Sequence, residues 1–279
     1  MSPREGPLGP RPLRGIRGVA FGSNDTLVRA VSGAWWPGVG FAAAVIAHRP
    51  GLVFDEAALA AALNAVIAFL YGVQSTPIPD VDQELGAALN AGIAFLDGVQ
   101  STPIQGVDQE REQLRESYRI VLRRLGCNQP DEGLVAELAH ERIAGRVIEP
   151  FEDTHDGLAR LRAKGFALGV VANAGPSLEG QYSRLGLRDF FEAFVISAQL
   201  GYRKPDPRIY LEACARLAMA PEEVLLVDDL DNVTAAQALG LDGLVMARDW
   251  HGEVRPAGTV INMRELEVVL RDRAQLRGR

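Results

Sequence analysis

Cysteine is nearly absent from this sequence. The 279 residues include only Cys127 and Cys214, which lie far apart and form no C-x-x-C spacing. This number and spacing argue against a disulfide framework and against a zinc knuckle. We therefore predict two buried thiols in a reducing compartment, which favours a cytoplasmic protein.

Histidine and basic residues are also scarce. The four histidines, His48, His140, His155 and His251, show neither an H-x-x-x-H nor an H-E-x-x-H spacing and predict no zinc site. The chain has 29 Lys and Arg against 36 Asp and Glu, a formal net charge of −7. With no dominant basic face, we expect neither nucleic acid nor an anionic membrane as a partner, while local anion sites remain compatible with this composition.

The sequence has no hydrophobic run that is long enough to cross a membrane. Its apolar segment at residues 57–73 contains Asn64 and is shorter than the roughly 20 residues that a spanning helix needs. Residues 1–15 are rich in Pro, Gly and Arg and lack the apolar centre of a signal peptide, so we predict a mobile tail there. With 47% hydrophobic residues, the rest of the chain can bury a sizeable core.

What the sequence does contain is a regular alternation of helix and strand patterns in its second half. We predict strands at 166–171, 193–196, 224–227 and 243–246, and helices at 153–164, 178–185, 206–217, 233–239 and 263–270. Short alternating units of this kind indicate a doubly wound α/β fold with a parallel sheet. Residues 16–30 and 149–279 are expected to form this core, and residues 31–148 an inserted all-helical cap domain.

The predicted cap domain contains a tandem duplication. Residues 61–84, AALNAVIAFLYGVQSTPIPDVDQE, recur as residues 87–110, AALNAGIAFLDGVQSTPIQGVDQE, and differ at four aligned positions. Each copy predicts a helix with an apolar stripe, followed by a turn and a loop. The stripe can pack inside the cap domain or form the contact of a homodimer. Asp55 and Asp131 stand at expected helix starts on either side of the duplication.

The first predicted strand ends in a loop of small polar residues. The stretch VAFGSNDTL, residues 19–27, passes from apolar residues directly into this loop. In open α/β folds, ligands bind at the carboxyl ends of the parallel strands. We therefore place the candidate site at this loop.

The same stretch resembles the first motif of the haloacid dehalogenase superfamily, an apolar strand followed by D-x-D-G-T-L. Thr26 and Leu27 match this pattern, whereas Gly22 replaces the nucleophilic Asp, Asn24 the acid/base Asp, and Asp25 the Gly. The resemblance implies a phosphatase-like hydrolase in which one Asp attacks phosphorus and the other transfers the proton. Because this chain lacks both groups, we expect a catalytically impaired member, a pseudoenzyme.

Two further stretches resemble the second and third motifs of this superfamily. In LGVVAN, residues 168–173, the motif's Thr or Ser is replaced by Ala172, while Asn173 is retained. The stretch GYRKPDP, residues 201–207, resembles G-x-x-K-P-x-P and is the most specific match in the chain. The resemblance implies that Lys204 places a cation where a phosphate oxygen and the nucleophile meet.

The stretch VDDLDN, residues 227–232, resembles the fourth motif, whose carboxylates suit Mg²⁺. Asp229 is our first choice as metal ligand, and Asp228 is the alternative because the loop is one residue shorter than the motif. Without another carboxylate in direct contact, only weak Mg²⁺ binding is expected. Asp231 or Asn232 is expected to cap the helix that follows.

Trp35 and Trp36 follow the first motif closely. If the cap domain faces the site, these rings can stack on an apolar or aromatic part of a ligand; alternatively, they pack between cap domain and core. The anion site itself would be formed by Lys204, Asn173 and the loop that includes Thr26.

Three functions follow from these features. The first is a non-hydrolytic member that binds a phosphorylated or anionic ligand, or a partner protein. The second is a Mg²⁺-dependent phosphomonoester hydrolase with an unorthodox site built on Asp25, Asp228 or Asp229. The third is an oligomeric scaffold that associates through the duplicated helices.

Overall fold

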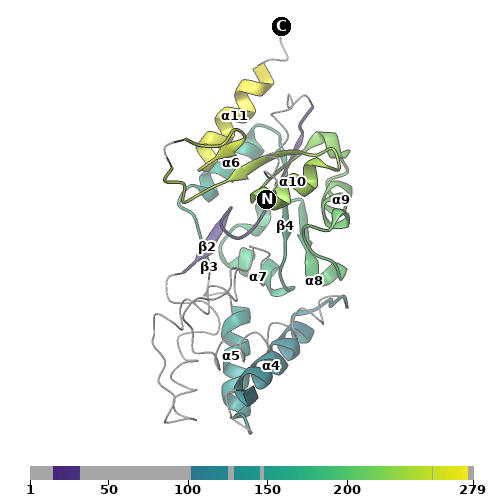
Figure 1. Ribbon diagram of the computed structural model, residues 1–279, viewed down its shortest axis with the longest axis vertical. Helices are drawn as coiled ribbons and strands as arrows, with labels where there is room; N and C mark the ends of the chain where they lie inside the picture. Colours follow the sequence, from purple (N-terminus) through teal and green to yellow (C-terminus); the bar gives the residue numbers. More distant parts are fainter. Residues whose placement is uncertain (1–14, 32–101, 125–128, 145–147, 253, 276–279) are drawn as a thin grey trace, which may run out of the picture.

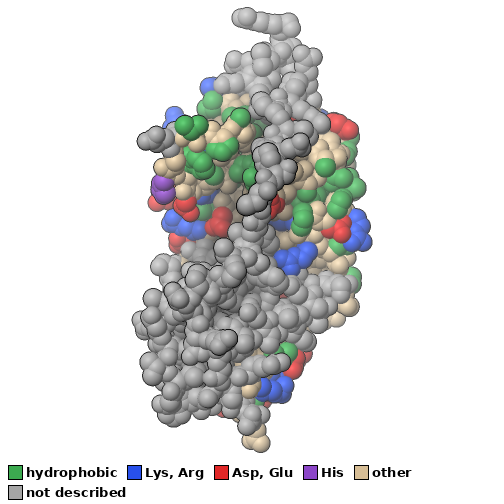
Figure 2. All heavy atoms as spheres, viewed as in Figure 1, with side chains coloured by type: hydrophobic (Ala, Val, Ile, Leu, Met, Phe, Trp, Pro, Cys, Tyr) green, Lys and Arg blue, Asp and Glu red, His purple; other side chains and the backbone are tan. Residues whose placement is uncertain are grey.

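The computed structural model describes residues 15–31, 102–124, 129–144, 148–252 and 254–275. Figure 1 shows a core with helices around a central sheet and, below it, a pair of helices that lies apart from the sheet. On the face seen in Figure 2, basic and acidic side chains of the described residues are interspersed rather than gathered by sign. No helix among the described residues combines the length and hydropathy of a membrane span.

The core is built on a six-stranded sheet with the order β5-β4-β1-β6-β7-β8. All of its strand pairs are parallel. Its strands are Gly18–Phe21 (β1), Ala167–Ala172 (β4), Ala193–Ile196 (β5), Val224–Asp228 (β6), Asp242–Met246 (β7) and Thr259–Val260 (β8). The predicted α/β class with a parallel sheet is confirmed. Because β1 lies between β4 and β6, its carboxyl end borders the ends of both neighbours.

Helices cover both faces of this sheet. They are Thr154–Ala163 (α6), Ser177–Arg184 (α7), Ser197–Leu200 (α8), Pro207–Arg216 (α9), Leu230–Gln237 (α10) and Met263–Gln275 (α11). Val19 and Phe21 pack in a core with residues of α6, α7 and α11, whereas Ala20 packs in a second core with residues of α9 and α10. This alternation along β1 is the pattern of a strand that is buried on both faces.

The structure corrects the predicted elements at three points. The last strand that we predict, at 243–246, is followed by a further strand, β8, which pairs beside it. Helix α10 begins at Leu230 instead of 233. Strands Val28–Ala30 (β2) and Ile148–Pro150 (β3) form an antiparallel pair that was not predicted. Elements of two or three residues are too short to produce a readable hydrophobic period.

The helices that lie apart from the sheet are Val107–Arg124 (α4) and Glu132–Ala144 (α5). The predicted helix start at Asp131 is confirmed, since its Oδ1 accepts a hydrogen bond of 2.7 Å from the backbone N–H of Leu134. Arg119 of α4 donates to Glu132 of α5 at 2.8 Å. The division into core and cap domain and the tail at 1–15 stay predictions. Residues 1–14, most of the duplication, Trp35, Trp36, Asp55, His48 and Cys127 lie outside the described residues.

The end of the second repeat copy lies within the described residues and contacts the core. The Ile104 backbone N–H donates to the Ala198 carbonyl at 2.8 Å. The Glu110 carboxylate accepts from the backbone N–H of Ser177 at 2.7 Å and from its hydroxyl at 2.8 Å, at the start of α7. A Cβ at Gly175 would lie 2.1 Å from Glu110 Oε1, so this close approach depends on glycine. Burial of the carboxyl raises the pKa of Glu110.

Arg248 ties the loop after β1 to the core. Its guanidinium donates to the Thr26 carbonyl at 2.7 and 3.0 Å and to the Asp153 carboxylate at 2.7 and 2.9 Å. The Arg248 side chain is only 5% exposed. The buried guanidinium of Arg248 therefore fixes the backbone of the loop that carries the candidate site.

We expect Arg248→Ala to lower the free energy of unfolding by about 3 kcal/mol, because it leaves the Thr26 carbonyl and the Asp153 carboxylate without this cation. Arg160→Ala is the matched control, since it removes an exposed pair with Glu267 that is worth about 0–1 kcal/mol. Denaturant unfolding measures both variants. Equal losses would contradict the assigned role of Arg248.

Candidate functional site

The site is centred on two residues that face each other at the ends of β1 and β6. Phe21 is paired with Val227 in the parallel register, so Gly22 and Asp228 are the next pair. The Gly22 backbone N–H donates to the Val227 carbonyl at 2.9 Å. Gly22 is buried, and Asp228 is 3% exposed.

The Asp228 carboxylate occupies the space that a side chain at position 22 would need. A Cβ built on Gly22 would lie 2.4 Å from Asp228 Oδ1 and 2.6 Å from its Cγ. The backbone of Gly22 does not require glycine, because its φ lies outside the left-handed region. What crowds a side chain at this position is the carboxylate on the neighbouring strand, which would have to move to admit a Cβ.

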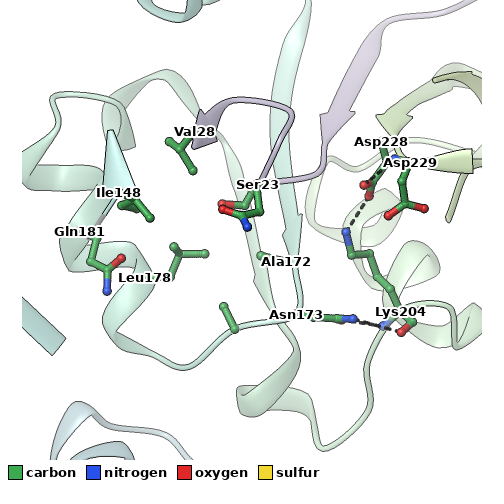
Figure 3. A pocket seen from close by; sticks show the side chains of 12 residues that line it. Ser23, Val28, Ile148, Ala172, Asn173, Leu178, Gln181, Lys204, Asp228 and Asp229 are labelled. Atoms are coloured by element: carbon green, nitrogen blue, oxygen red, sulfur yellow. Dashed lines mark hydrogen bonds and ion pairs between the residues drawn. The ribbon is translucent and has the colours of Figure 1, made fainter. Parts of the chain in front are cut away.

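Lys204 is the counter-ion of this carboxylate. Its Nζ lies 2.6 Å from Asp228 Oδ2, and both side chains are almost fully buried. The backbone of Lys204 is clamped by Asn173, whose Oδ1 accepts from the Lys204 N–H at 2.7 Å and whose Nδ2 donates to its carbonyl at 3.1 Å. Asn173 therefore acts on Lys204 by fixing its backbone (Figure 3).

Asp229 begins helix α10. Its two carboxylate oxygens accept from the backbone N–H of Asn232 at 2.9 Å and from the side-chain Nδ2 of the same residue at 2.7 Å. The N-cap is thus Asp229, and the prediction that Asp231 or Asn232 takes this role is wrong. Burial raises the pKa of Asp229 to about 6, with a further increase from Asp228 and an opposing effect of Lys204.

These groups line one end of a cavity of about 530 Å³, a volume that includes space open to solvent. The charged end is formed by Lys204, Asp228 and Asp229, and the apolar side contains side chains of β2, β3, β4 and α7 (Figure 3). The lining residues are Ser23, Asn24, Val28, Ile148, Ala172, Asn173, Ala174, Leu178, Gln181, Lys204, Asp228 and Asp229. A cavity with one polar end and an apolar wall suits a small molecule that carries a charged group.

The structure brings most, but not all, of the predicted site residues together. Asp25 is exposed and does not line the cavity. Its φ of 54° lies in the left-handed region, which agrees with the Gly of the resembled motif at this position. Although the side chain is exposed, nearby protein atoms partly desolvate its carboxyl and, together with the charge of Asp249, raise the pKa of Asp25. Thr26 is buried and also lies outside the lining, with its carbonyl bound by Arg248.

Sequence reasoning missed the polar lining residues Ser23 and Gln181, and also Tyr182, which contacts Ser23 without lining the cavity. The Ser23 hydroxyl lies in the cavity wall, 2.8 Å from the hydroxyl of the buried Tyr182 on α7. The only signal for Ser23 was its place in the loop between Gly22 and Asn24. Tyr182 follows the apolar spacing of a helix, which predicts burial but no role at the site.

Asp228 and Asp229 are already engaged by donors of the protein. Asp228 already accepts from Lys204 Nζ and from the Asp229 N–H at 2.9 Å, and Asp229 accepts twice from Asn232. Within the described residues no cluster of three or more His, Cys, Asp or Glu is suited to hold a metal. The ammonium of Lys204 is the cation in contact with Asp228, and Asp229 and Asp228 are the carboxylates that would hold a Mg²⁺ ion.

The chain is similar to known proteins over this part. A family model described as haloacid dehalogenase-like hydrolase matches residues 108–246, a range that includes Lys204, Asp228 and Asp229 but not Gly22 or Asn24. A glyceraldehyde 3-phosphate phosphatase from Methanopyrus kandleri is 33% identical over 144 residues, which is 50% of this chain and 61% of that protein. A phosphoglycolate phosphatase from Thiobacillus denitrificans is 32% identical over 124 residues, which covers 40% and 53% of the two chains. The chain thus spans between half and two thirds of the length of these relatives.

Solved structures share the fold. An L-2-haloacid dehalogenase from Xanthobacter autotrophicus has a TM-score of 0.57 at 18% identity, covering 92% of this chain and 98% of the other. A HAD-hydrolase from Bacillus subtilis, solved with bound magnesium, has a TM-score of 0.52 at 18% identity, covering 92% and 99%. At this identity the likeness concerns the fold alone.

Because Gly22 and Asp228 face each other, exchanging the two residues tests whether they share one space. Asp228→Gly should destabilise the protein by about 3–5 kcal/mol, because the buried ammonium of Lys204 loses its partner. Gly22→Asp should also destabilise it, because a second carboxylate enters the space of the first. The double variant restores one carboxylate to this space, and we expect its stability to recover to within about 1 kcal/mol of the wild type, a strong coupling between neighbouring sites.

Unfolding free energies from guanidinium titrations measure this cycle. The control double variant combines Gly22→Asp with Asp231→Gly, which changes a nearby exposed carboxylate and should give no recovery. Additive losses in the Gly22→Asp, Asp228→Gly variant would show that the two positions do not share one space.

Proposed function

Since this chain belongs to the haloacid dehalogenase-like hydrolase superfamily, we propose that it binds a small phosphorylated or otherwise anionic ligand without hydrolysing it through an aspartyl-phosphate. The ligand's charged group would lie at Lys204, and its apolar part along the walls formed by Val28, Ile148 and Leu178. Homology alone assigns the chain to hydrolases of this type and names no substrate.

One observation carries the proposal: the space of a nucleophile at position 22 is filled by the Asp228 carboxylate, which is held by Lys204. Asn24 lines the cavity but cannot exchange a proton at neutral pH, and Ala172 offers no hydroxyl. Loss of a nucleophile alone can lower kcat on the order of a millionfold in a well-studied hydrolase. Three changes at one site support retention of the cavity without its reaction.

The charges of the cavity set a condition on anion binding. Lys204 and Asp228 compensate each other, and Asp229 adds a negative charge at neutral pH. The negative charge of Asp229 therefore repels a bound anion as long as this carboxyl is ionised. We accordingly propose that the ligand binds more tightly in weakly acidic solution, where Asp229 is protonated.

A second candidate is a phosphomonoester hydrolase, and the position of Asp228 favours it. This carboxylate reaches the place of the missing side chain and lines the same cavity. Both of its oxygens are engaged by donors, however, and it lacks an acid/base partner at position 24. We therefore rank this candidate second. The oligomeric scaffold depends on the duplicated helices, which lie largely outside the described residues.

The first prediction from this proposal concerns turnover. The wild type should hydrolyse glyceraldehyde 3-phosphate, phosphoglycolate and p-nitrophenyl phosphate no faster than Asp229→Asn, with or without Mg²⁺, because no nucleophile or general acid is present. Phosphate release measures the rates, and a purified phosphatase of the same superfamily verifies the assay. Mg²⁺-dependent turnover that disappears in Asp229→Asn would favour the hydrolase instead.

The second prediction concerns pH. The pKa of Asp229 is raised from 3.8 to about 6, so this carboxyl is charged at pH 7.5 and largely protonated at pH 5. Sulfate keeps its double charge in this range, and we expect its affinity to rise several-fold as the pH falls from 7.5 to 5, because one repulsive charge disappears.

Calorimetric titration of sulfate at both pH values measures this change. Asp229→Asn is the control, since Asn retains the ability to cap α10 and carries no charge at either pH. This variant should bind sulfate at pH 7.5 about as well as the wild type does at pH 5. An unchanged pH dependence in Asp229→Asn would assign the effect to another group.

A further inference from the structure

A hydroxyl pair joins the cavity wall at Ser23 to Tyr182 on α7, which does not itself line the cavity. The Ser23 Oγ and the Tyr182 Oη are 2.8 Å apart, and both side chains are buried. Phe21 pairs with Val170 in the register of β1 and β4, and two residues further along lie Ser23, in the loop after β1, and Ala172, at the end of β4. Both residues line the cavity (Figure 3).

The surroundings of Tyr182 hold its ring in place and keep its hydroxyl protonated. Its ring packs against Phe191 and Phe194, with centroid distances of 6.0 and 5.1 Å. Burial raises the pKa of Tyr182, so the phenol keeps its proton. Its hydroxyl is hydrogen-bonded to Ser23, and either hydroxyl can be the donor. When the phenol donates to Ser23 Oγ, the serine proton is directed elsewhere.

We propose that Ser23, oriented by Tyr182, donates a hydrogen bond to the anionic group of the ligand bound at Lys204. The group is a tetrahedral oxyanion, such as a phosphate ester, whose oxygens can accept from a hydroxyl and an ammonium together. Ser23 is the ligand-contacting residue and Tyr182 the positioning residue. This inference rests on the proposed anion-binding function. It assigns to Ser23 the hydroxyl that the resembled second motif has at the position of Ala172.

A purely structural role is the competing explanation. In that case the pair only fastens the loop after β1 to α7, and its loss lowers stability without a specific effect on the ligand. Ser197 offers a matched comparison: it is also buried, its hydroxyl accepts from the Ala174 N–H at 3.1 Å, and it does not line the cavity.

The experiment measures sulfate and inorganic phosphate affinity of the full chain at pH 5, together with thermal stability. Ser23→Ala should weaken both affinities about tenfold or more, as expected for a lost hydrogen bond to a charged group. Ser23→Thr, which retains the hydroxyl, should restore binding to within a few-fold of the wild type. Tyr182→Phe should weaken binding by a smaller factor, and Ser197→Ala should leave it unchanged at a comparable loss of stability.

The outcomes separate this inference from the function on which it rests. If the wild type binds and Lys204→Met abolishes binding while Ser23→Ala binds normally, Ser23 is not a contact and the inference alone is overturned. If the wild type binds neither anion, the proposed function fails and the inference fails with it. If Ser23→Ala does not fold, equal affinities of Tyr182→Phe and the wild type overturn the assignment of the pair.

Discussion

The buried ion pair between Lys204 and Asp228 is the interaction on which the site depends. Its atoms lie 2.6 Å apart in a nearly water-free position, and an unpaired charge at such a position is strongly destabilising. The pair requires a small residue at position 22, because its carboxylate fills that space. It also requires a fixed backbone at Lys204, which Asn173 provides. Under the proposed function, the glycine at position 22, where the resembled motif has its nucleophile, is one part of this arrangement.

The same arrangement is the physical basis of the proposal that this hydrolase fold keeps a cavity without the usual reaction. The Asp228 carboxylate at the end of β6 faces Gly22, and the Ser23 hydroxyl, in the loop after β1, lines the cavity together with Ala172 of β4. Each group remains at the carboxyl edge of the sheet, so the cavity stays polar at one end. A carboxylate whose oxygens are engaged by Lys204 and a backbone N–H serves as a counter-ion, and this role suits recognition of an anion better than attack on one.

Much of the fold was predictable from the sequence, and the site only in part. The alternating apolar segments predicted the parallel sheet, and its geometry brings Lys204, Asp228 and Asp229 to one edge, as their positions at strand and loop ends suggest. The contact between Gly22 and Asp228 was not predictable, because it depends on the register of two strands that lie about two hundred residues apart. The N-cap was assigned to Asp231 or Asn232 instead of Asp229 because the short loop left the helix start ambiguous. Ser23 was missed because its partner Tyr182 comes from a different element.

A crystal structure of the wild type soaked with sulfate at weakly acidic pH tests the central claim most directly. The account predicts that the Asp228 carboxylate remains against Gly22 and bonded to Lys204, with sulfate between Lys204 and Ser23. An Asp228 side chain turned away from Gly22, with a metal ion or a ligand oxygen in the vacated space, would contradict it and would identify a site that is still arranged for catalysis.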